Sequence, residues 1–164
     1  MTPDWLQMMA RYTVWQHGWM IPACDMLDDV EADRGLFFGS VANTLRHILW
    51  ADQIWMSRFD DYPPPVGLFA ESVTCGGDWA SYKLARSAMD TTIAEWAERA
   101  DCDGDLTFFS GVYGRDVTFP RMRLYTHFFN HATQHRGQVH AVLTQAGIAT
   151  QDTDLFLMPE EIPS

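Results

Sequence analysis

Hydrophobic residues recur at helical spacing in four long stretches of the chain. The first stretch runs from Pro3 to about Leu27, and Thr2 before it has the hydroxyl that suits a helix N-cap. The apolar residues at this spacing are Trp5, Met8, Met9, Tyr12, Trp15 and Trp19. Pro22 falls inside the stretch, and we expect it to bend or frame the last turns. The pattern therefore predicts a first helix over about residues 3–27.

The second and third stretches also begin after residues that favour helix starts. Ser40 precedes a stretch over about residues 41–59, and Asp78 precedes one that reaches about Ala100. Between them, residues 60–77 contain three consecutive prolines and three glycines. That composition predicts a long loop, and loops of this length in a compact domain often shape a site.

A short hairpin is predicted before the last stretch. Two β-prone runs, 106–109 and 117–119, flank a turn that contains two glycines. Pro120 then starts a helix that continues to Ala146 and is followed by Gly147, a common residue just past a helix end. Four helices of roughly 20 residues with one long crossover loop predict an all-α four-helix bundle.

Composition fits one folded domain over residues 1–164 and limits its partners. The chain has 164 residues, 47% of them hydrophobic, with seven Trp and ten Phe, so it can bury a core. Acidic residues outnumber basic ones 22 to 11, for a formal net charge of −11. Because such a surface repels phosphate groups, nucleic acids and anionic membranes are not expected as partners.

The cysteines bear on the cellular compartment. Cys24, Cys75 and Cys102 are odd in number, widely spaced and without a CxxC motif, which indicates a reduced, cytoplasmic protein. No signal peptide and no membrane-spanning apolar run are visible. Cys75 lies in the glycine-containing loop and is a candidate nucleophile.

Candidate chemistry centres on three histidines of the last predicted helix. His127, His131 and His135 recur every four residues, so a helix places them in one stripe. Two imidazoles at this spacing can bind one metal ion. The helical metalloprotease motif is excluded, because it needs Glu after the first histidine and Ala132 follows His131. The stripe is half of a metal site that needs a third ligand.

His47 is the best candidate for the third ligand. It lies in the middle of the second predicted helix among apolar residues, where a metal or a hydrogen bond has to satisfy its nitrogens. Asp52, five residues later, does not share its face well. A ferritin-like di-iron centre is excluded, because it needs Glu-x-x-His pairs and no Glu precedes a His by three residues. His140 is interpreted as a packed or solvated residue.

Two segments give the chain a specific resemblance to a known family. Residues 40–55, SVANTLRHILWADQIW, resemble the second-helix signature of the DinB family, and residues 130–139, NHATQHRGQV, resemble its fourth-helix signature. Smaller matches are Tyr12, Trp15, Gln145–Ile148 and Asp154–Leu155. The resemblance spans almost the whole chain, and it implies a bundle in which one histidine of helix two and two of helix four hold a divalent metal.

By this resemblance the metal ligands are His47, His131 and His135. The remaining positions on the metal are then open to water or substrate, as in catalytic zinc sites. Three neutral imidazoles accept zinc, nickel, iron or copper, so the identity of the one divalent ion stays open, with zinc, nickel and iron as the leading candidates.

The resemblance implies an enzyme but leaves its class open. DinB proteins are described as metal-dependent hydrolases, and relatives include thiol-dependent transferases that use mycothiol or bacillithiol. We therefore expect a small-molecule substrate, with a low-molecular-weight thiol as one candidate. The rival hypothesis is a non-enzymatic binding module with a structural or sensing ion, because no general base stands near the histidine pair. We also expect a homodimer, since bundles of this family often pair and the first helix is rich in aromatic residues.

Other residues near these motifs have alternative interpretations. His17 stands where the family usually has Asn and is expected to add a polar group near the site, whereas Gln134 replaces a frequent His with little consequence. His127 is either a further ligand or a cavity residue. For Arg136 we expect pairing with an acid, with binding of an anionic substrate as the alternative, and Gly137 is expected to let a neighbouring helix approach.

Overall fold

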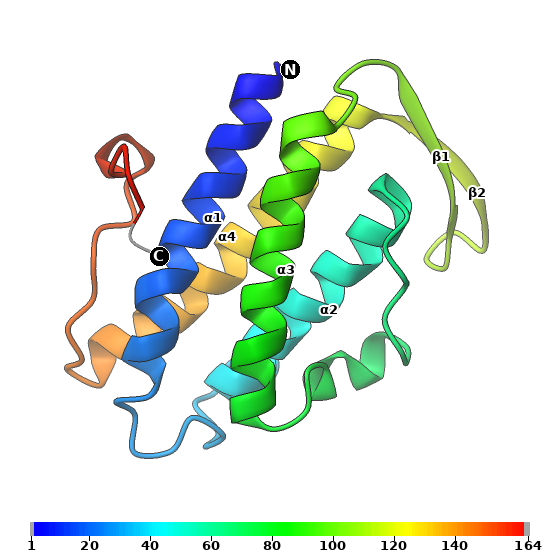
Figure 1. Cartoon of the computed structure of the whole chain (residues 1–164). Coiled ribbons are helices and arrows are strands. Elements are labelled where there is room, and N and C mark those ends of the chain that lie inside the picture. The colour runs from blue at the N-terminus through cyan, green and yellow to red at the C-terminus, as the bar shows by residue number, and fades with distance from the viewer. Residues whose placement is uncertain (1, 163–164) are drawn as a thin grey trace.

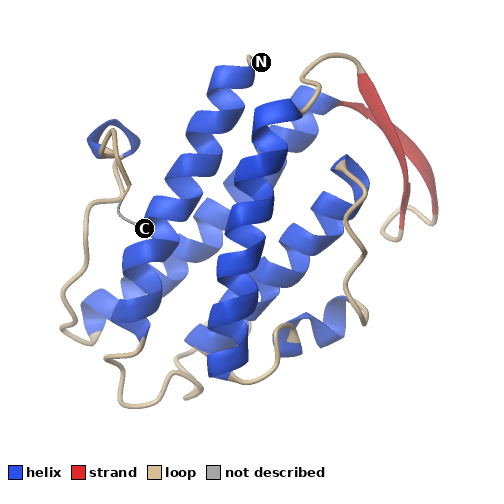
Figure 2. Ribbon diagram, viewed as in Figure 1, coloured by secondary structure: helices blue, strands red, loops and turns tan. Residues whose placement is uncertain are grey.

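The computed structural model describes residues 2–162, and most of these residues are helical (Figures 1 and 2). The elements in chain order are α1 (Pro3–Cys24), α2 (Val41–Phe59), η1 (Phe69–Thr74), α3 (Trp79–Arg99), β1 (Asp105–Ser110), β2 (Arg115–Pro120), α4 (Arg121–Gln145) and η2 (Leu155–Leu157), where η marks a 3-10 helix. The predicted all-α class and the predicted hairpin before the last helix are confirmed.

The first three long helices begin at the predicted caps. Each cap side chain accepts a hydrogen bond from the backbone N–H three residues later: Thr2 from Trp5, Ser40 from Asn43 and Asp78 from Ser81. The predicted end of α1 at Leu27 is wrong, because the helix ends at Cys24. Beyond it the N–H groups of Met26 and Leu27 bond three residues back instead of four, which tightens the chain into a turn.

The four long helices share one apolar interior. Helix α1 packs against α3 and α4, and α2 packs against the same two helices, so all four lie side by side (Figure 1). The interior is filled by large side chains with almost no exposed surface, among them Leu6, Met20, Leu45, Ile48, Leu49, Met56, Met89, Ile93, Trp96 and Phe129. Burying such a side chain stabilises the fold by about 1.5–3 kcal/mol, so this interior holds the helices together.

A charged network is buried in the same interior. Arg86 of α3 is fully buried between Asp52 of α2, at 2.5 Å, and Asp90 of α3, at 2.8 Å. Burial acts to lower the pKa of the Arg86 guanidinium, but Asp90 and Asp52 raise that pKa above its ordinary value, so Arg86 stays charged. His17 of α1 contacts Asp90 through Nδ1 at 3.0 Å. The network therefore links α1, α2 and α3 through buried polar groups.

The connections leave the helices at different places. Strands β1 and β2 pair antiparallel from Asp105 opposite Pro120 to Ser110 opposite Arg115, and this hairpin extends beside the C-terminal end of α2 (Figure 1). The crossover after α2 is not loop throughout, because it contains η1, which packs on α2. Within residues 2–162, no helix combines the length and the apolar character needed to cross a membrane.

Candidate metal centre

Three histidines from two packed helices lie together where α2 meets α4. His47 of α2 and His131 and His135 of α4 each offer one ring nitrogen, and these three nitrogens lie within 4.8 Å of one another. The Nε2 atoms of His47 and His131 are 3.3 Å apart. Nitrogen ligands at about 2.0–2.1 Å around a tetrahedral zinc ion are separated by about 3.3–3.4 Å. The cluster therefore has the donor set that one metal ion requires, and the His47–His131 pair has the required spacing.

Hydrogen bonds orient two of these imidazoles. The Nδ1 atom of His47 lies 3.0 Å from the hydroxyl of Ser72 in η1, and Nδ1 of His135 lies 2.9 Å from Oε1 of Gln138 on the same helix. The Gln138 oxygen can only accept, so Nδ1 of His135 donates and its Nε2 is the nitrogen left for a metal. Such partners fix the ring orientation and tautomer of metal-binding histidines.

Burial keeps two of the three imidazoles neutral. It lowers the pKa of His47 to about 4, with a further contribution from His135. It lowers the pKa of His131 to about 3, and the neighbouring His135, His47 and His127 add to the effect. A neutral imidazole at pH 7 has a nitrogen lone pair that a cation can use.

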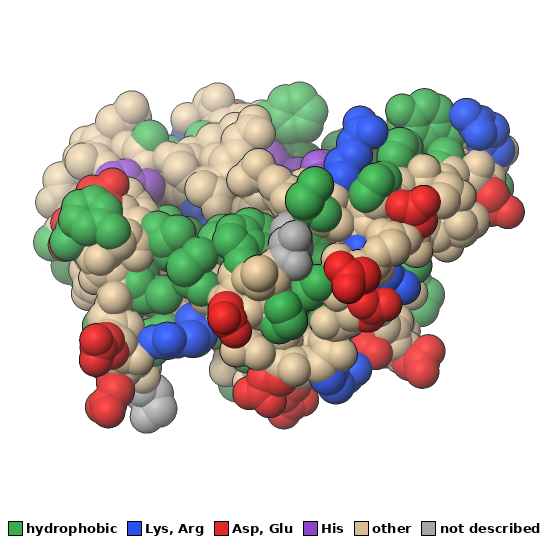
Figure 3. Space-filling view, turned by 90° about the horizontal axis from the view of Figure 1, so that it is seen from above, with side chains coloured by type: hydrophobic (Ala, Val, Ile, Leu, Met, Phe, Trp, Pro, Cys, Tyr) green, Lys and Arg blue, Asp and Glu red, His purple; other side chains and the backbone are tan. Residues whose placement is uncertain are grey.

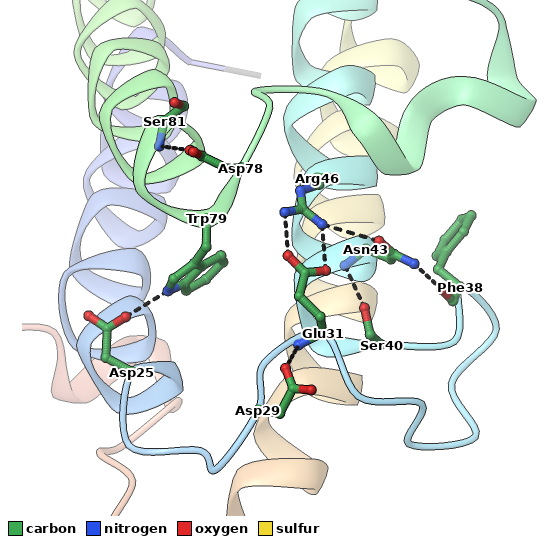
Figure 4. A network of polar contacts seen from close by, with 10 residues as sticks. All are labelled: Asp25, Asp29, Glu31, Phe38, Ser40, Asn43, Arg46, Asp78, Trp79 and Ser81. Atoms are coloured by element: carbon green, nitrogen blue, oxygen red, sulfur yellow. Dashed lines mark hydrogen bonds and ion pairs between the residues drawn. The ribbon is translucent and has the colours of Figure 1, made fainter.

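The linker between α1 and α2 places an aromatic wall against His47. The ring of Phe38 stacks on the His47 imidazole with a centroid separation of 4.1 Å. Two contacts anchor this linker to the first turns of α2: Arg46 donates to Glu31 at 2.7 Å, and the Asn43 amide donates to the Phe38 carbonyl at 3.1 Å (Figure 4). The anchored ring shields one side of the cluster from water.

A pocket of about 930 Å³ opens beside the cluster, between α2, α4, the crossover and the hairpin. His47 and His131 form part of its wall. The rest of its wall is mostly apolar and includes Trp50, Ala51, Ile54, Trp55, Leu68, Phe69, Phe108, Val117, Phe119 and Leu124. His127 also lines this pocket, with its ring 5.2 Å from that of Trp55, but it is not part of the three-histidine cluster. A small molecule in this pocket would contact the cluster from one side.

The comparison with protein families agrees with this geometry. The model of the DinB family matches residues 3–162, which is nearly the whole chain. The chain belongs to the DinB family. It matches none of the curated proteins and none of the solved structures with which it was compared. Family membership and the histidine cluster together fit a DinB-like metal-binding protein, and the resemblance found in the two signature segments is confirmed.

Two expectations for the His-Arg-Gly-Gln segment of this DinB chain are wrong. Gly137 is exposed, and a β-carbon added to it would meet no atom within 4 Å, so no helix needs the space. Arg136 is buried but forms no ion pair with any carboxylate of residues 2–162. It donates to the Thr133 hydroxyl at 3.1 Å, and its guanidinium lies 5.5 Å from the Tyr12 ring centroid. The contacts of Arg136 are therefore one turn back on α4, at Thr133, and on α1, at Tyr12.

Other candidates lie away from the cluster. His17 is buried against Asp90 and adds no polar group to the pocket. Cys75 donates to the Gln53 side chain at 3.4 Å, and burial raises the pKa of its thiol, which opposes a role as an activated nucleophile. His140 packs edge-on against Trp19 at 5.9 Å, as expected of a packed residue.

Sequence reasoning missed the two residues that orient the imidazoles. The contact of Gln138 with His135 could have been predicted, because a residue three positions after His135 lies on the same face of the helix. The contact of Ser72 with His47 could not, because Ser72 lies in the crossover, 25 residues from His47 along the chain. Only the packing of η1 on α2 brings its hydroxyl to the imidazole.

Proposed function

We propose that this DinB protein holds one divalent metal ion on His47, His131 and His135 and is a metal-dependent enzyme that acts on a small molecule. The observation that carries the proposal is the convergence of these three imidazoles beside a large, mostly apolar pocket, whose wall includes His47 and His131. Zinc, nickel and iron suit three imidazole ligands. Structural zinc sites have four protein ligands, whereas catalytic ones have three and an open position, so the donor count favours an enzyme.

The residues around the cluster have separate tasks in this proposal. A bound metal would act as a Lewis acid on a water molecule or a thiol from the pocket side. Ser72 and Gln138 hold the ligand imidazoles in place through Nδ1. Phe38 covers one face of the His47 ring, which reduces its contact with water and strengthens electrostatic interactions on that side.

Thiol-dependent transfer is the reaction class that the pocket favours over hydrolysis. No Asp or Glu is among the pocket-lining residues of the described chain, so no carboxylate is placed to act as a general base on water, and His127 is the lining imidazole outside the cluster that could take that role. A thiolate held by a metal is already a nucleophile and needs no such base. A low-molecular-weight thiol is therefore the proposed first substrate.

We also propose that the chain forms one four-helix-bundle domain in a reducing, cytoplasmic setting. The pairwise packing of α1, α2, α3 and α4 supports a DinB-type four-helix bundle that forms one domain. The three cysteines form no disulfide in the described residues, which supports a reducing, cytoplasmic setting. The homodimer and the exclusion of nucleic acid and membrane as partners stay predictions from the sequence.

Metal analysis followed by a thiol assay tests the function. Purified protein is expected to contain one divalent ion per chain and to consume a low-molecular-weight thiol together with an electrophile. A chelator should abolish this consumption, and returning the metal should restore it. One ion per chain with no turnover of any thiol or hydrolysable substrate would favour the non-enzymatic alternative, with a structural or sensing ion.

Replacing Ser72 with alanine is expected to weaken zinc affinity by about 10–100-fold, because His47 loses the partner that fixes its ring. Competition with a chromogenic chelator measures the affinity. Ser57→Ala is the matched control, because Ser57 also carries a bonded hydroxyl, but this bonds to the Ile54 carbonyl within α2, away from the cluster. Equal affinity of the Ser72 variant and the Ser57 variant would contradict the orienting role.

A further inference from the structure

Two arginines of the pocket have no acidic partner. Arg58 of α2 and Arg123 of α4 line the pocket, and within residues 2–162 neither forms an ion pair or a side-chain hydrogen bond. Six other cationic side chains each pair with a carboxylate: Arg34, Arg46, Lys83, Arg86, Arg99 and Arg121. Acidic residues outnumber basic ones 22 to 11 in this chain, so partners are plentiful elsewhere. Arg11, Arg115 and Arg136 also form no ion pair within the described residues, but none of them lines this pocket. Arg58 and Arg123 are thus the pocket-lining cations, and neither meets an acid of the described chain.

Aromatic rings hold these guanidinium groups instead. The Arg58 guanidinium carbon lies 4.6 Å from the Trp55 ring centroid and 4.4 Å from that of Phe108, and the Arg123 carbon lies 4.8 Å from the Phe119 centroid. Stacking uses the flat face of a guanidinium and leaves its N–H donors free. Burial removes part of the water around the Arg58 guanidinium and lowers its pKa. No carboxylate of the described chain compensates for this lost hydration.

The remaining pocket lining matches an anion with an apolar body. No acidic residue is among the described lining residues, and tryptophan and phenylalanine side chains cover much of the wall. In the view from above, histidine and Lys or Arg side chains lie next to one another among hydrophobic ones in the upper half of the molecule (Figure 3). A planar guanidinium binds carboxylate, sulfonate or phosphate oxygens through paired N–H donors.

We propose that the pocket selects an amphipathic anion. The apolar, ring-sized body packs against Trp50, Trp55 and Phe108, and the acidic group binds Arg58 and Arg123. A neutral molecule would leave the Arg58 charge without a partner, and a cation would meet two like charges. The inference rests on the proposed function only in placing the reactive end of the molecule at the histidine cluster.

Two matched fluorescent probes test this selectivity on the full chain. 8-Anilinonaphthalene-1-sulfonate and N-phenyl-1-naphthylamine share the same rings and differ in the sulfonate. In the double variant Arg58→Gln, Arg123→Gln, the ratio of the two affinities is expected to shift about tenfold toward the neutral probe, equivalent to about 1.4 kcal/mol. Arg58→Lys, which keeps the charge, should retain most of the preference for the sulfonate.

The charge-matched control is Arg115→Gln. Arg115 lies on the same hairpin that borders the pocket but is not among the lining residues. Its guanidinium contacts the wall only over the Tyr113 ring, at 5.9 Å from the centroid. Its loss removes one positive charge, as Arg123→Gln alone does, whereas the double variant removes two. The affinity ratio in this variant should equal that of the unaltered protein. Circular dichroism checks that each variant is folded, and Arg123→Gln alone serves if the double variant is not. An unchanged ratio in folded pocket variants would overturn the proposal.

A metal-free arm separates this inference from the proposed function. His135→Ala removes one proposed ligand without altering the pocket lining. If the sulfonate preference persists in this variant and in protein stripped of metal, the anion binds the arginines, whether or not the enzyme proposal holds. If the preference vanishes with the metal and survives Arg58→Gln, the anion binds the metal and the selectivity proposal is wrong.

Discussion

Replacing His47, His131 or His135 with alanine is expected to remove most of the bound metal. Each substitution leaves two imidazoles, and no other His, Cys, Asp or Glu of the described chain belongs to the cluster. The loss of affinity should exceed the roughly 10–100-fold effect of an orienting partner, because a bond to the metal itself is lost. Metal content after dialysis, measured by mass spectrometry, checks this expectation.

Two other histidines of α4 are the controls for that experiment. His140→Ala should keep the full metal content, because His140 packs against Trp19 outside the cluster. His127→Ala should also keep it, because His127 lies in the pocket wall. A His47 variant with full metal content, together with a His127 variant that loses it, would move the site one turn along α4.

Replacing Arg86 with alanine is expected to lower the free energy of unfolding by about 3–5 kcal/mol. Arg86 is fully buried, and its removal leaves the nearby carboxylates of Asp52 and Asp90 without their cationic partner. Whole domains are stable by about 5–15 kcal/mol, so this one change removes a large share. Urea denaturation followed by tryptophan fluorescence measures it.

Arg99→Ala is the comparison for the buried pair. Arg99 donates to the Asp60 carboxylate through two nitrogens, but both of these side chains are in contact with solvent. Water replaces the lost interaction there, so the unfolding free energy should change far less. Equal decreases in the free energy of unfolding for the two variants would show that burial does not determine how much the Arg86 network stabilises the fold.

Local rules made much of the fold readable from the sequence. The cap residues Ser40 and Asp78 and the helical spacing of apolar residues depend on neighbours within one turn, so they predicted the starts of α2 and α3. The same locality placed His131 and His135 on one face of α4. His47 was readable because a polar side chain in an apolar stretch needs a partner.

Only the tertiary structure decided how these pieces meet. The contacts of Ser72 with His47 and of Arg86 with Asp52 could not be predicted, because the partners lie far apart along the chain. A hydrogen bond or ion pair between such residues depends on how the helices pack. The same reason made the expectations for Arg136 and Gly137 wrong. The sequence by itself determined the helices and the spacing of their histidines, through contacts within a turn. Packing of α2 against α4, η1 and the hairpin decided the cluster's partners and its pocket, because those contacts have no local pattern.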